Sequence, residues 1–282
     1  MRANALRLSA VLACLAALLP EAAQAQSAAS DWLKGNSSRV RLIAAQIQPG
    51  VLLAGIQIDL EPGWKTYWRS PGDAGGVPPE LDWKKSINLG APELLFPAPS
   101  RLRDRDGDSV GYKHAVILPV RIVPLSPAQP IVLDLNILFG VCKNICIPEE
   151  RHLTLTLEPK GETDGTIAEL LSRALASVPV DMASDPKAPQ LEAIKVDTGT
   201  PKPALVFDTR FPSGGDGADL FVEAVDGSFV PMTEHLTDTG DGHVGFKIDL
   251  GKSDDLKSPK GKALRLTLVS SAGAAQIIRT VP

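Results

Sequence analysis

The sequence predicts an all-β protein made of an antiparallel β-sandwich, then one helix, then a second and smaller β-sandwich. Two observations predict this class. Apolar and polar residues alternate with a period of two along several short stretches, as in antiparallel strands that turn one face to a core. Gly and Pro are also frequent, at 24 each among 282 residues, which favours many short elements joined by turns.

Strands of the first sandwich are predicted where this alternation is clearest. Residues 56–60 alternate Ile and Leu with Gln and Asp. Residues 131–139 place Ile, Leu and Phe side chains on one face, and residues 153–157 alternate Leu with Thr. Each stretch would place one face on a core and the other in water. We expect the first domain to occupy residues 28–160.

A helix and a linker are predicted for residues 161–189. The helix is predicted by its apolar spacing, a capping box and a stop signal: residues 167–178, Thr166 with Glu169, and Pro179. Residues 181–190 are rich in Pro, Ala, Asp and Lys, a composition typical of linkers.

The second sandwich is predicted for residues 190–282. Alternation returns at residues 244–250, where Val, Phe, Ile and Leu occupy every second position, and at residues 264–268, where Leu does. Turn signals separate these stretches, which is typical of sandwich domains.

The N-terminal 25 residues are predicted to be a secretory signal peptide. Arg2 and Arg7 give it a positive start, residues 6–19 are almost entirely apolar, and an A-x-A cleavage signal ends at Ala25. The apolar run is short for a membrane span. No later segment reaches 18 apolar residues, so we expect an exported mature chain without a membrane span.

Charge and motifs exclude several function classes. The net charge is −4 at pH 7, whereas binding to nucleic acid or to an anionic membrane needs a basic face. The chain has no G-x-S-x-G motif, no H-E-x-x-H motif and no phosphate-binding glycine loop. We therefore expect no nucleic-acid partner and no hydrolase of these types.

Two cysteines remain in the mature chain, Cys142 and Cys146, because Cys14 lies in the signal peptide. They flank a turn between two predicted strands, and a tight turn brings its ends within reach of a disulfide. The ring closed by this bond would hold five residues and would stabilise the fold by only about 2 kcal/mol. Such a bond can open and close with little effect on the fold, which favours redox exchange.

Two alternatives use the same cysteines. The bond could be a structural hairpin disulfide in a β-sandwich interaction module. The two thiolates could instead bind copper(I) or zinc together with His114 or His152, as in a periplasmic copper-binding or copper-stress module, although C-x3-C lacks the second pair of ligands typical of zinc sites. We expect no cofactor.

Around the cysteines, the sequence resembles the N-terminal periplasmic domain of DsbD-type thiol:disulfide interchange proteins. It is closest to the branch that includes the suppressor-of-copper-sensitivity B protein. The resemblance is carried by five segments in order: residues 63–68 (GWKTYW), 71–75 (PGDAG), 96–99 (FPAP), 118–120 (LPV) and 142–148 (CKNICIP). Together they span most of the first domain.

The resemblance implies an immunoglobulin-like domain with thiol–disulfide oxidoreductase activity of the protein-disulfide reductase type. Such a domain takes electrons from a membrane-embedded donor and passes them to periplasmic thioredoxin-fold proteins. In the family the second cysteine forms the mixed disulfide, which makes Cys146 the exchanging cysteine and Cys142 the resolving one. We expect a separate membrane protein to act as the donor, and a periplasmic location.

Two features depart from the family pattern. Well-known members space their cysteines more widely and shield them with an aromatic cap loop. The corresponding stretch here, residues 104–112, offers Tyr112 alone. The aromatic block of Trp64, Tyr67 and Trp68 is expected to serve core and turn packing, because large aromatic side chains are usually buried.

Overall fold

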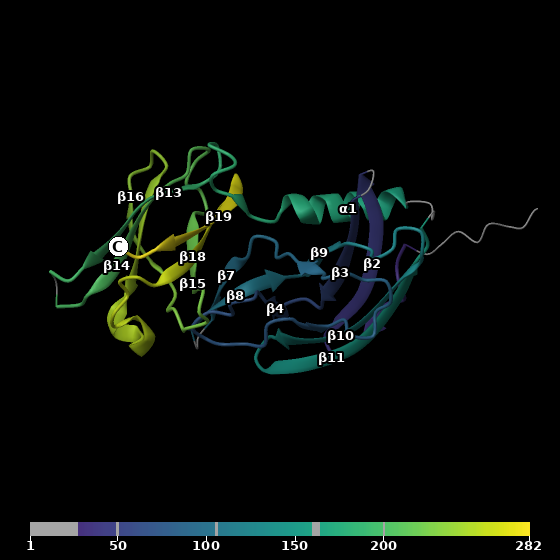
Figure 1. Ribbon diagram of the computed structural model, residues 1–282. Coiled ribbons are helices and arrows are strands. Elements are labelled where there is room, and N and C mark those ends of the chain that lie inside the picture. The colour runs from purple at the N-terminus through teal and green to yellow at the C-terminus, as the bar shows by residue number, and fades with distance from the viewer. Residues whose placement is uncertain (1–27, 49–50, 105–106, 160–163, 200) are drawn as a thin grey trace, which may run out of the picture.

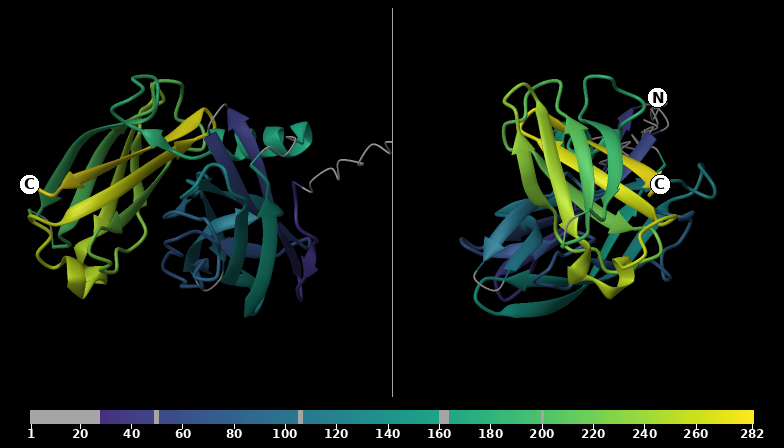
Figure 2. Two further views of the ribbon diagram at one scale, coloured as in Figure 1. Left: turned by 45° about the vertical axis from the view of Figure 1, so that its right-hand side comes forward. Right: turned by 90° about the vertical axis from the view of Figure 1, so that its left-hand side faces the viewer.

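The chain forms two β-sandwiches that lie side by side (Figure 1). A computed structural model describes residues 28–48, 51–104, 107–159, 164–199 and 201–282. The predicted signal peptide, residues 1–25, lies outside the described residues. Views from two further directions show the same separation into two bodies (Figure 2).

The first sandwich is built from two sheets. In the described residues, one sheet has five strands in the order β1 (Leu33–Lys34), β2 (Ser38–Gln48), β3 (Val51–Leu60), β9 (Ala115–Ile122) and β6 (Glu93–Leu94). The other has the order β11 (Cys146–Leu157), β10 (Ile131–Cys142), β4 (Lys65–Tyr67), β8 (Gly107–Lys113) and β7 (Ser100–Asp104), and β5 (Glu80–Asp82) also pairs with β10. All of these pairings are antiparallel.

The predicted alternation is the physical basis of this sandwich. Along β10, every second side chain from Ile131 to Phe139 is buried, and β11 alternates in the same way. In β3 the alternation holds from residue 56 to residue 59, whereas residues 53–56 are all buried because helix α1 (Gly165–Ala176) covers the other face. Burial of such a face removes apolar surface from water, which stabilises the fold by roughly 25 cal/mol per Å² of buried apolar area. The predicted strands at residues 56–60, 131–139 and 153–157 are therefore confirmed.

Helix α1 (Gly165–Ala176) covers the outer face of the five-stranded sheet (Figure 1). Its buried residues Ile167 and Leu171 pack against Ile43 and Leu53 of β2 and β3. The helix is confirmed, but the predicted capping box is wrong. The carboxylate of Asp164 accepts the first free backbone N–H groups of the helix, at 2.8 and 3.2 Å, so it occupies the cap position.

In the described residues, the second sandwich has two four-stranded sheets. The first has the order β12 (Val180–Asp181), β19 (Gly273–Thr280), β18 (Ala263–Ser270) and β15 (Asp219–Ala224). The second has the order β13 (Gln190–Asp197), β14 (Ala204–Arg210), β17 (His243–Asp249) and β16 (Glu234–Asp238). Two short 3-10 helices, η1 (Leu250–Lys252) and η2 (Asp254–Leu256), follow β17.

The predicted alternating stretches lie in the core of this sandwich. Val244, Phe246, Ile248 and Leu250 are buried there, although Leu250 already belongs to η1. Met182 and Ala188, from the stretch expected to be a linker, are buried in the same core. We therefore propose that the second domain begins near residue 180.

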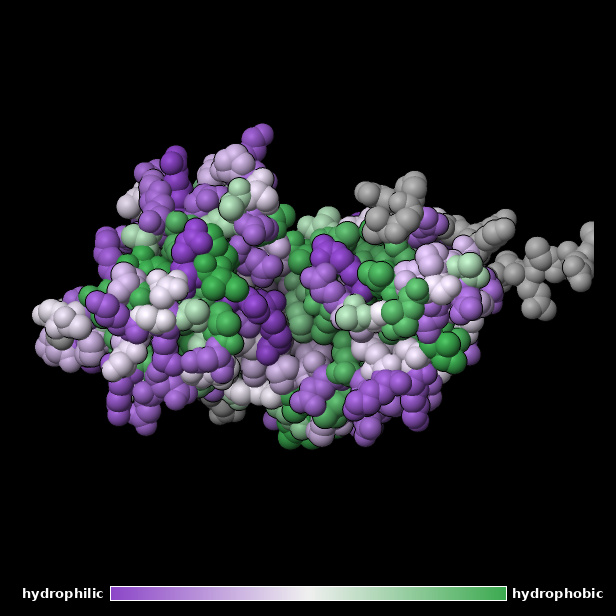
Figure 3. Space-filling model, viewed as in Figure 1, coloured by the Kyte–Doolittle hydropathy of each residue, from purple (hydrophilic) through white to green (hydrophobic). Residues whose placement is uncertain are grey.

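The two sandwiches are in direct contact. Phe221 of β15 is buried among the core residues of the first sandwich. On the face seen in Figure 3 the two bodies appear as lobes, with apolar surface along the line where they meet.

Among the described residues, no helix combines the length and apolar character that a membrane crossing requires.

Candidate functional site

The two cysteines close the end of a long hairpin. β10 and β11 pair along their whole length, from Ile131 with Leu157 to Cys142 with Cys146 as the last pair. Three turn residues join them, and the Lys143 N–H donates to the Ile145 carbonyl at 3.2 Å. Cys142 and Cys146 form a disulfide, with their Cα atoms 4.1 Å apart. The turn that carries them lies at the end of the first sandwich nearer the second (Figure 1).

The two sulfur-bearing residues differ in their exposure. Cys142 is only 6% exposed, because β10 is an inner strand and Cys142 pairs with Lys65 of β4 on its other side. Cys146 is exposed, since β11 is the edge strand of its sheet. Next to it, Ile145 is 67% exposed at the tip of the turn. An incoming sulfur can therefore approach Cys146 more readily than Cys142.

A buried tyrosine contacts the exposed cysteine. Tyr67 is 2% exposed, and its hydroxyl oxygen lies 3.0 Å from the Cys146 sulfur. Its ring packs against two glycines. A Cβ atom at Gly76 would lie 2.3 Å from the ring, and one at Gly140 would lie 3.0 Å from it. The missing side chains at these positions let the ring reach the sulfur.

Polar side chains fix β4, the short strand that ends with Tyr67. The Thr66 hydroxyl donates to the Gly140 carbonyl at 2.8 Å. The buried Lys65 ammonium donates to the Ser109 hydroxyl at 2.7 Å. Buried polar groups need such partners, so β4 is held between β10 on one side and β8 on the other.

The aromatic block packs as predicted, with one addition. Tyr67 and Trp68 are buried and Trp64 is partly buried. The sulfur contact of Tyr67 was missed, because a sequence gives no sign of which buried aromatic side chain meets a strand about 80 positions away. The only signal was the position of Tyr67 inside the GWKTYW segment.

The predicted cap stretch, residues 104–112, forms most of the β7–β8 hairpin, with residues 105–106 outside the described residues. Tyr112 is buried in this hairpin, and its hydroxyl donates to the Pro97 carbonyl at 2.9 Å. Burial raises the pKa of this hydroxyl well above its usual value. Tyr67, from β4, thus contacts the cysteine pair, whereas the Tyr112 hydroxyl bonds to Pro97.

The structure does not bring His152 to the cysteines. His152 lies six positions along β11 from Cys146, about 20 Å for an extended strand, and its ring nitrogen lies 2.9 Å from the Asp134 carboxylate. His114 lies in the turn after β8 with φ +66°. Within the described parts of the chain, no three His, Cys, Asp or Glu side chains form a metal-binding group.

Comparison with known proteins agrees with this geometry. Residues 34–158 match the family model described as thiol:disulfide interchange protein DsbD, N-terminal. These residues are therefore similar to the DsbD N-terminal family. The matched region includes both cysteines and Tyr67, and it ends before α1. The first sandwich is therefore a thiol–disulfide exchange domain that carries the Cys142–Cys146 disulfide.

A solved structure resembles nearly the whole chain. The crystal structure of the N-terminal periplasmic domain of ScsB from Proteus mirabilis superposes with a TM-score of 0.70 at 22% identity. The match covers 90% of this chain and 98% of that one, so the likeness in fold extends beyond the DsbD N-terminal domain into the second sandwich. Among curated proteins, no sequence matches this chain.

Proposed function

We propose that this protein relays electrons by thiol–disulfide exchange through Cys142 and Cys146. The observation that carries the proposal is the contrast between an exposed Cys146 and a buried Cys142 at the end of one hairpin. Exchange begins with attack at an accessible sulfur and ends with attack by a second, neighbouring thiol. The pair offers one cysteine for each role, with Cys146 as the exchanging cysteine and Cys142 as the resolving one.

The step can be written with all atoms balanced. In the reduced protein, the Cys146 thiolate attacks a disulfide of the partner, and one partner sulfur leaves as a thiolate that takes up a proton. The Cys142 thiolate then attacks the Cys146 sulfur, which restores the Cys142–Cys146 disulfide and releases the second partner sulfur as a thiol. The partner gains two electrons and two protons, and this protein loses them.

The reverse reaction reduces the disulfide form of the protein to its dithiol form. A donor dithiol attacks the exposed Cys146 sulfur of the disulfide form, and its second thiol resolves the mixed disulfide. We propose a membrane-embedded protein as donor, thioredoxin-fold proteins as acceptors and the periplasm as the location. Support comes from the family of residues 34–158 and from the periplasmic domain with the similar fold.

A trapping experiment tests the proposal. The Cys142→Ala variant retains the exchanging cysteine but lacks the resolving one, so it should accumulate a mixed disulfide with its partner at Cys146. The matched Cys146→Ala variant should accumulate far less, because Cys142 is buried. Both variants would be expressed as the full chain, quenched with acid to stop exchange, then blocked with an alkylating agent near neutral pH, and separated without reductant so that trapped partners can be identified.

Two outcomes would contradict the relay. In one, Cys142→Ala traps no partner. In the other, the wild-type disulfide resists dithiothreitol until the protein unfolds, which is the behaviour of a structural hairpin bond.

A further inference from the structure

We propose that the second sandwich positions the redox site by holding Tyr67 against Cys146. Three residues of β15, Asp219, Phe221 and Glu223, act as the positioning residues, and we call them the β15 clamp. The inference rests on the proposed function of the cysteine pair, because it concerns what sets the reactivity of Cys146.

Strand β15 is buried on both of its faces. Leu220 and Val222 point into the core of the second sandwich. The alternate residues, those of the β15 clamp, point to the first sandwich. Side chains of a strand alternate between its faces. The same strand therefore contributes to the core of the second sandwich and contacts the first sandwich.

Phe221 forms the apolar centre of the clamp. It is 2% exposed, and its ring lies 5.8 Å from the ring of Trp68 in a tilted arrangement. Trp68 is itself 1% exposed. Aromatic pairs of this geometry stabilise beyond the area that they bury, so Phe221 fixes the position of Trp68.

Glu223 binds the next residue of the same segment. The Arg69 guanidinium donates to both carboxylate oxygens of Glu223, at 2.7 to 3.1 Å, and both side chains are largely buried. The guanidinium also lies 4.1 Å from the centre of the Trp68 ring. A bidentate pair is geometrically more specific than a single ionic contact, so Arg69 is held in both distance and direction.

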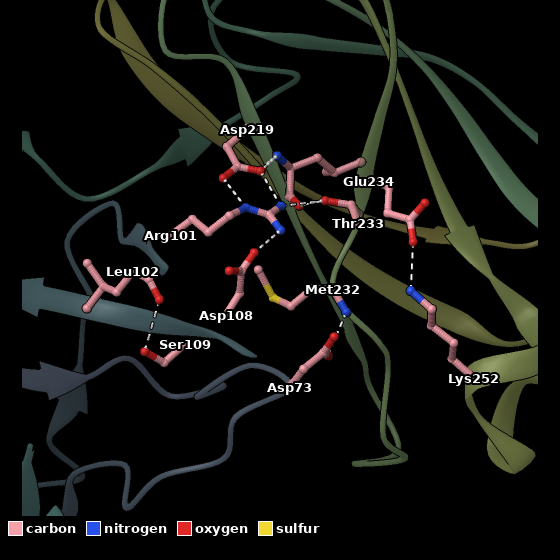
Figure 4. Close-up of polar contacts among 11 residues, drawn as sticks. Asp73, Arg101, Leu102, Asp108, Ser109, Asp219, Met232, Thr233, Glu234 and Lys252 are labelled. Atoms are coloured by element: carbon pink, nitrogen blue, oxygen red, sulfur yellow. Dashed lines mark hydrogen bonds and ion pairs between the residues drawn. The ribbon is translucent and has the colours of Figure 1, made fainter. Parts of the chain in front are cut away.

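Asp219 completes the clamp on the β7–β8 hairpin (Figure 4). Arg101 of β7 donates to both oxygens of Asp219 at 2.7 and 2.9 Å, and also bonds Asp108 and Thr233. Burial lowers the pKa of Arg101, but the hydrogen bonds and charges of Asp219 and Asp108 outweigh it and raise the pKa overall. Arg101 thus remains a cation in a well-satisfied site.

Consecutive residues link the clamp to the sulfur. Tyr67 contacts Cys146, and the next two residues, Trp68 and Arg69, are the ones that the clamp holds. The loop that supports the Tyr67 ring through Gly76 is also tied to the second sandwich. Its Asp73 carboxylate accepts the backbone N–H of Met232 at 2.8 Å (Figure 4).

This arrangement predicts how the clamp acts on the chemistry. A hydroxyl that donates to the Cys146 thiolate stabilises the ionised form, which is the reactive one. If the clamp is weakened, the segment from Tyr67 to Arg69 can shift and the hydroxyl spends less time at the sulfur. The thiolate should then form at higher pH, although no residue of the clamp touches it.

The test measures the alkylation of Cys146 by iodoacetamide as a function of pH. It uses residues 26–282, which include both sandwiches, in a Cys142→Ala background, where Cys146 is the sole thiol. Asp219→Asn with Glu223→Gln weakens the clamp with almost no change in shape. We expect the half-maximal pH to rise and the rate at pH 7 to fall about threefold or more.

Two features separate positioning from a direct charge effect. Removal of two carboxylates would by itself favour the thiolate and lower the half-maximal pH, which is the opposite direction. Phe221→Leu weakens the clamp without any change of charge and should raise the half-maximal pH as well. Asp208→Asn with Asp226→Asn, which removes two exposed carboxylates of the same sandwich, serves as the matched control.

A Tyr67→Phe background decides the mechanism. There Phe221→Leu should cause no further change, and Asp219→Asn with Glu223→Gln should no longer raise the half-maximal pH, because the hydroxyl that the clamp positions is absent. An unchanged pH profile in the original background, or an equal shift in both backgrounds, overturns the inference. These results do not depend on partner trapping, so failure of the clamp and failure of the electron relay are distinguishable.

Discussion

Cys142 and Cys146 are four positions apart in the sequence, yet they occupy different environments. One lies on an inner strand between two neighbours, and the other begins an edge strand. The spacing predicted a hairpin disulfide in outline, but exposure depends on which strands flank the hairpin. That information is tertiary, so the division of roles proposed for the cysteines came from the family resemblance, and the structure adds the difference in their exposure.

The hydroxyl of Tyr67 is predicted to stabilise the thiolate of Cys146 and so to increase its reactivity at pH 7. In a Cys142→Ala background, Tyr67→Phe removes one hydrogen bond from the thiolate while it keeps the ring that fills the space beside Gly76 and Gly140. A hydrogen bond of about 1 kcal/mol corresponds to roughly fivefold in the ionisation equilibrium. Alkylation of Cys146 at pH 7 should therefore slow by about that factor, with the same limiting rate at high pH.

Tyr112→Phe provides the matched control for this effect. Its hydroxyl is also buried but donates to the Pro97 carbonyl. This variant should leave the alkylation profile of Cys146 in place, and an equal shift from both variants would show that the effect is not specific to the sulfur contact.

At the scale of single elements, the strands with a clear period of two and the helix were predicted, whereas the short strands and the 11-residue β2 were not. β10 has every second residue buried along its predicted stretch, and a core-facing period of two leaves a clear pattern. β4 and β5 have three residues each, too few for any period. They are strands because β10 and β8 offer backbone partners, and the candidate site depends on β4.

The start of α1 provides a test at this scale. Asp164→Ala removes the carboxylate that caps two backbone N–H groups and should lower the free energy of unfolding by about 1 kcal/mol. Thr166→Ala, which would remove the cap in the capping-box interpretation, should have a smaller effect. Urea unfolding of both variants and the wild type would compare them, and a larger loss in Thr166→Ala would restore the sequence-based interpretation.

For the whole molecule, the contact between the sandwiches was the feature least accessible from sequence. The stretch 219–224 reads Asp-Leu-Phe-Val-Glu-Ala, and its two charged residues, Asp219 and Glu223, would ordinarily be expected in water. They are instead turned to Arg101 and Arg69 of the other sandwich. Ion pairs between distant segments leave no local pattern, because each partner alone resembles an ordinary surface residue.

The shared core predicts that the two sandwiches unfold together. All four Trp residues lie in the first sandwich, at positions 32, 64, 68 and 83, so tryptophan fluorescence reports on this sandwich and on its contact with Phe221, whereas far-ultraviolet circular dichroism reports on both sandwiches. In the wild type the two signals should give the same urea midpoint.

Phe221→Ala, a change in the second sandwich, should lower the free energy of unfolding detected by tryptophan fluorescence by about 3 kcal/mol. The exposed Phe229 of the same sandwich supplies the control, and Phe229→Ala should have little effect. If Phe221→Ala changes only the dichroism signal, the two sandwiches unfold independently.

The hairpin also restricts how a binding protein can distinguish the dithiol form of this protein from its disulfide form. The cysteine pair is the terminal rung of a ladder that continues through eleven further residue pairs, so scission of the bond leaves those pairs in place. No distant surface needs to rearrange between the dithiol and disulfide states. A protein that binds one state in preference to the other is therefore expected to contact the few atoms at the tip of the β10–β11 hairpin, where Ile145 and Cys146 are exposed.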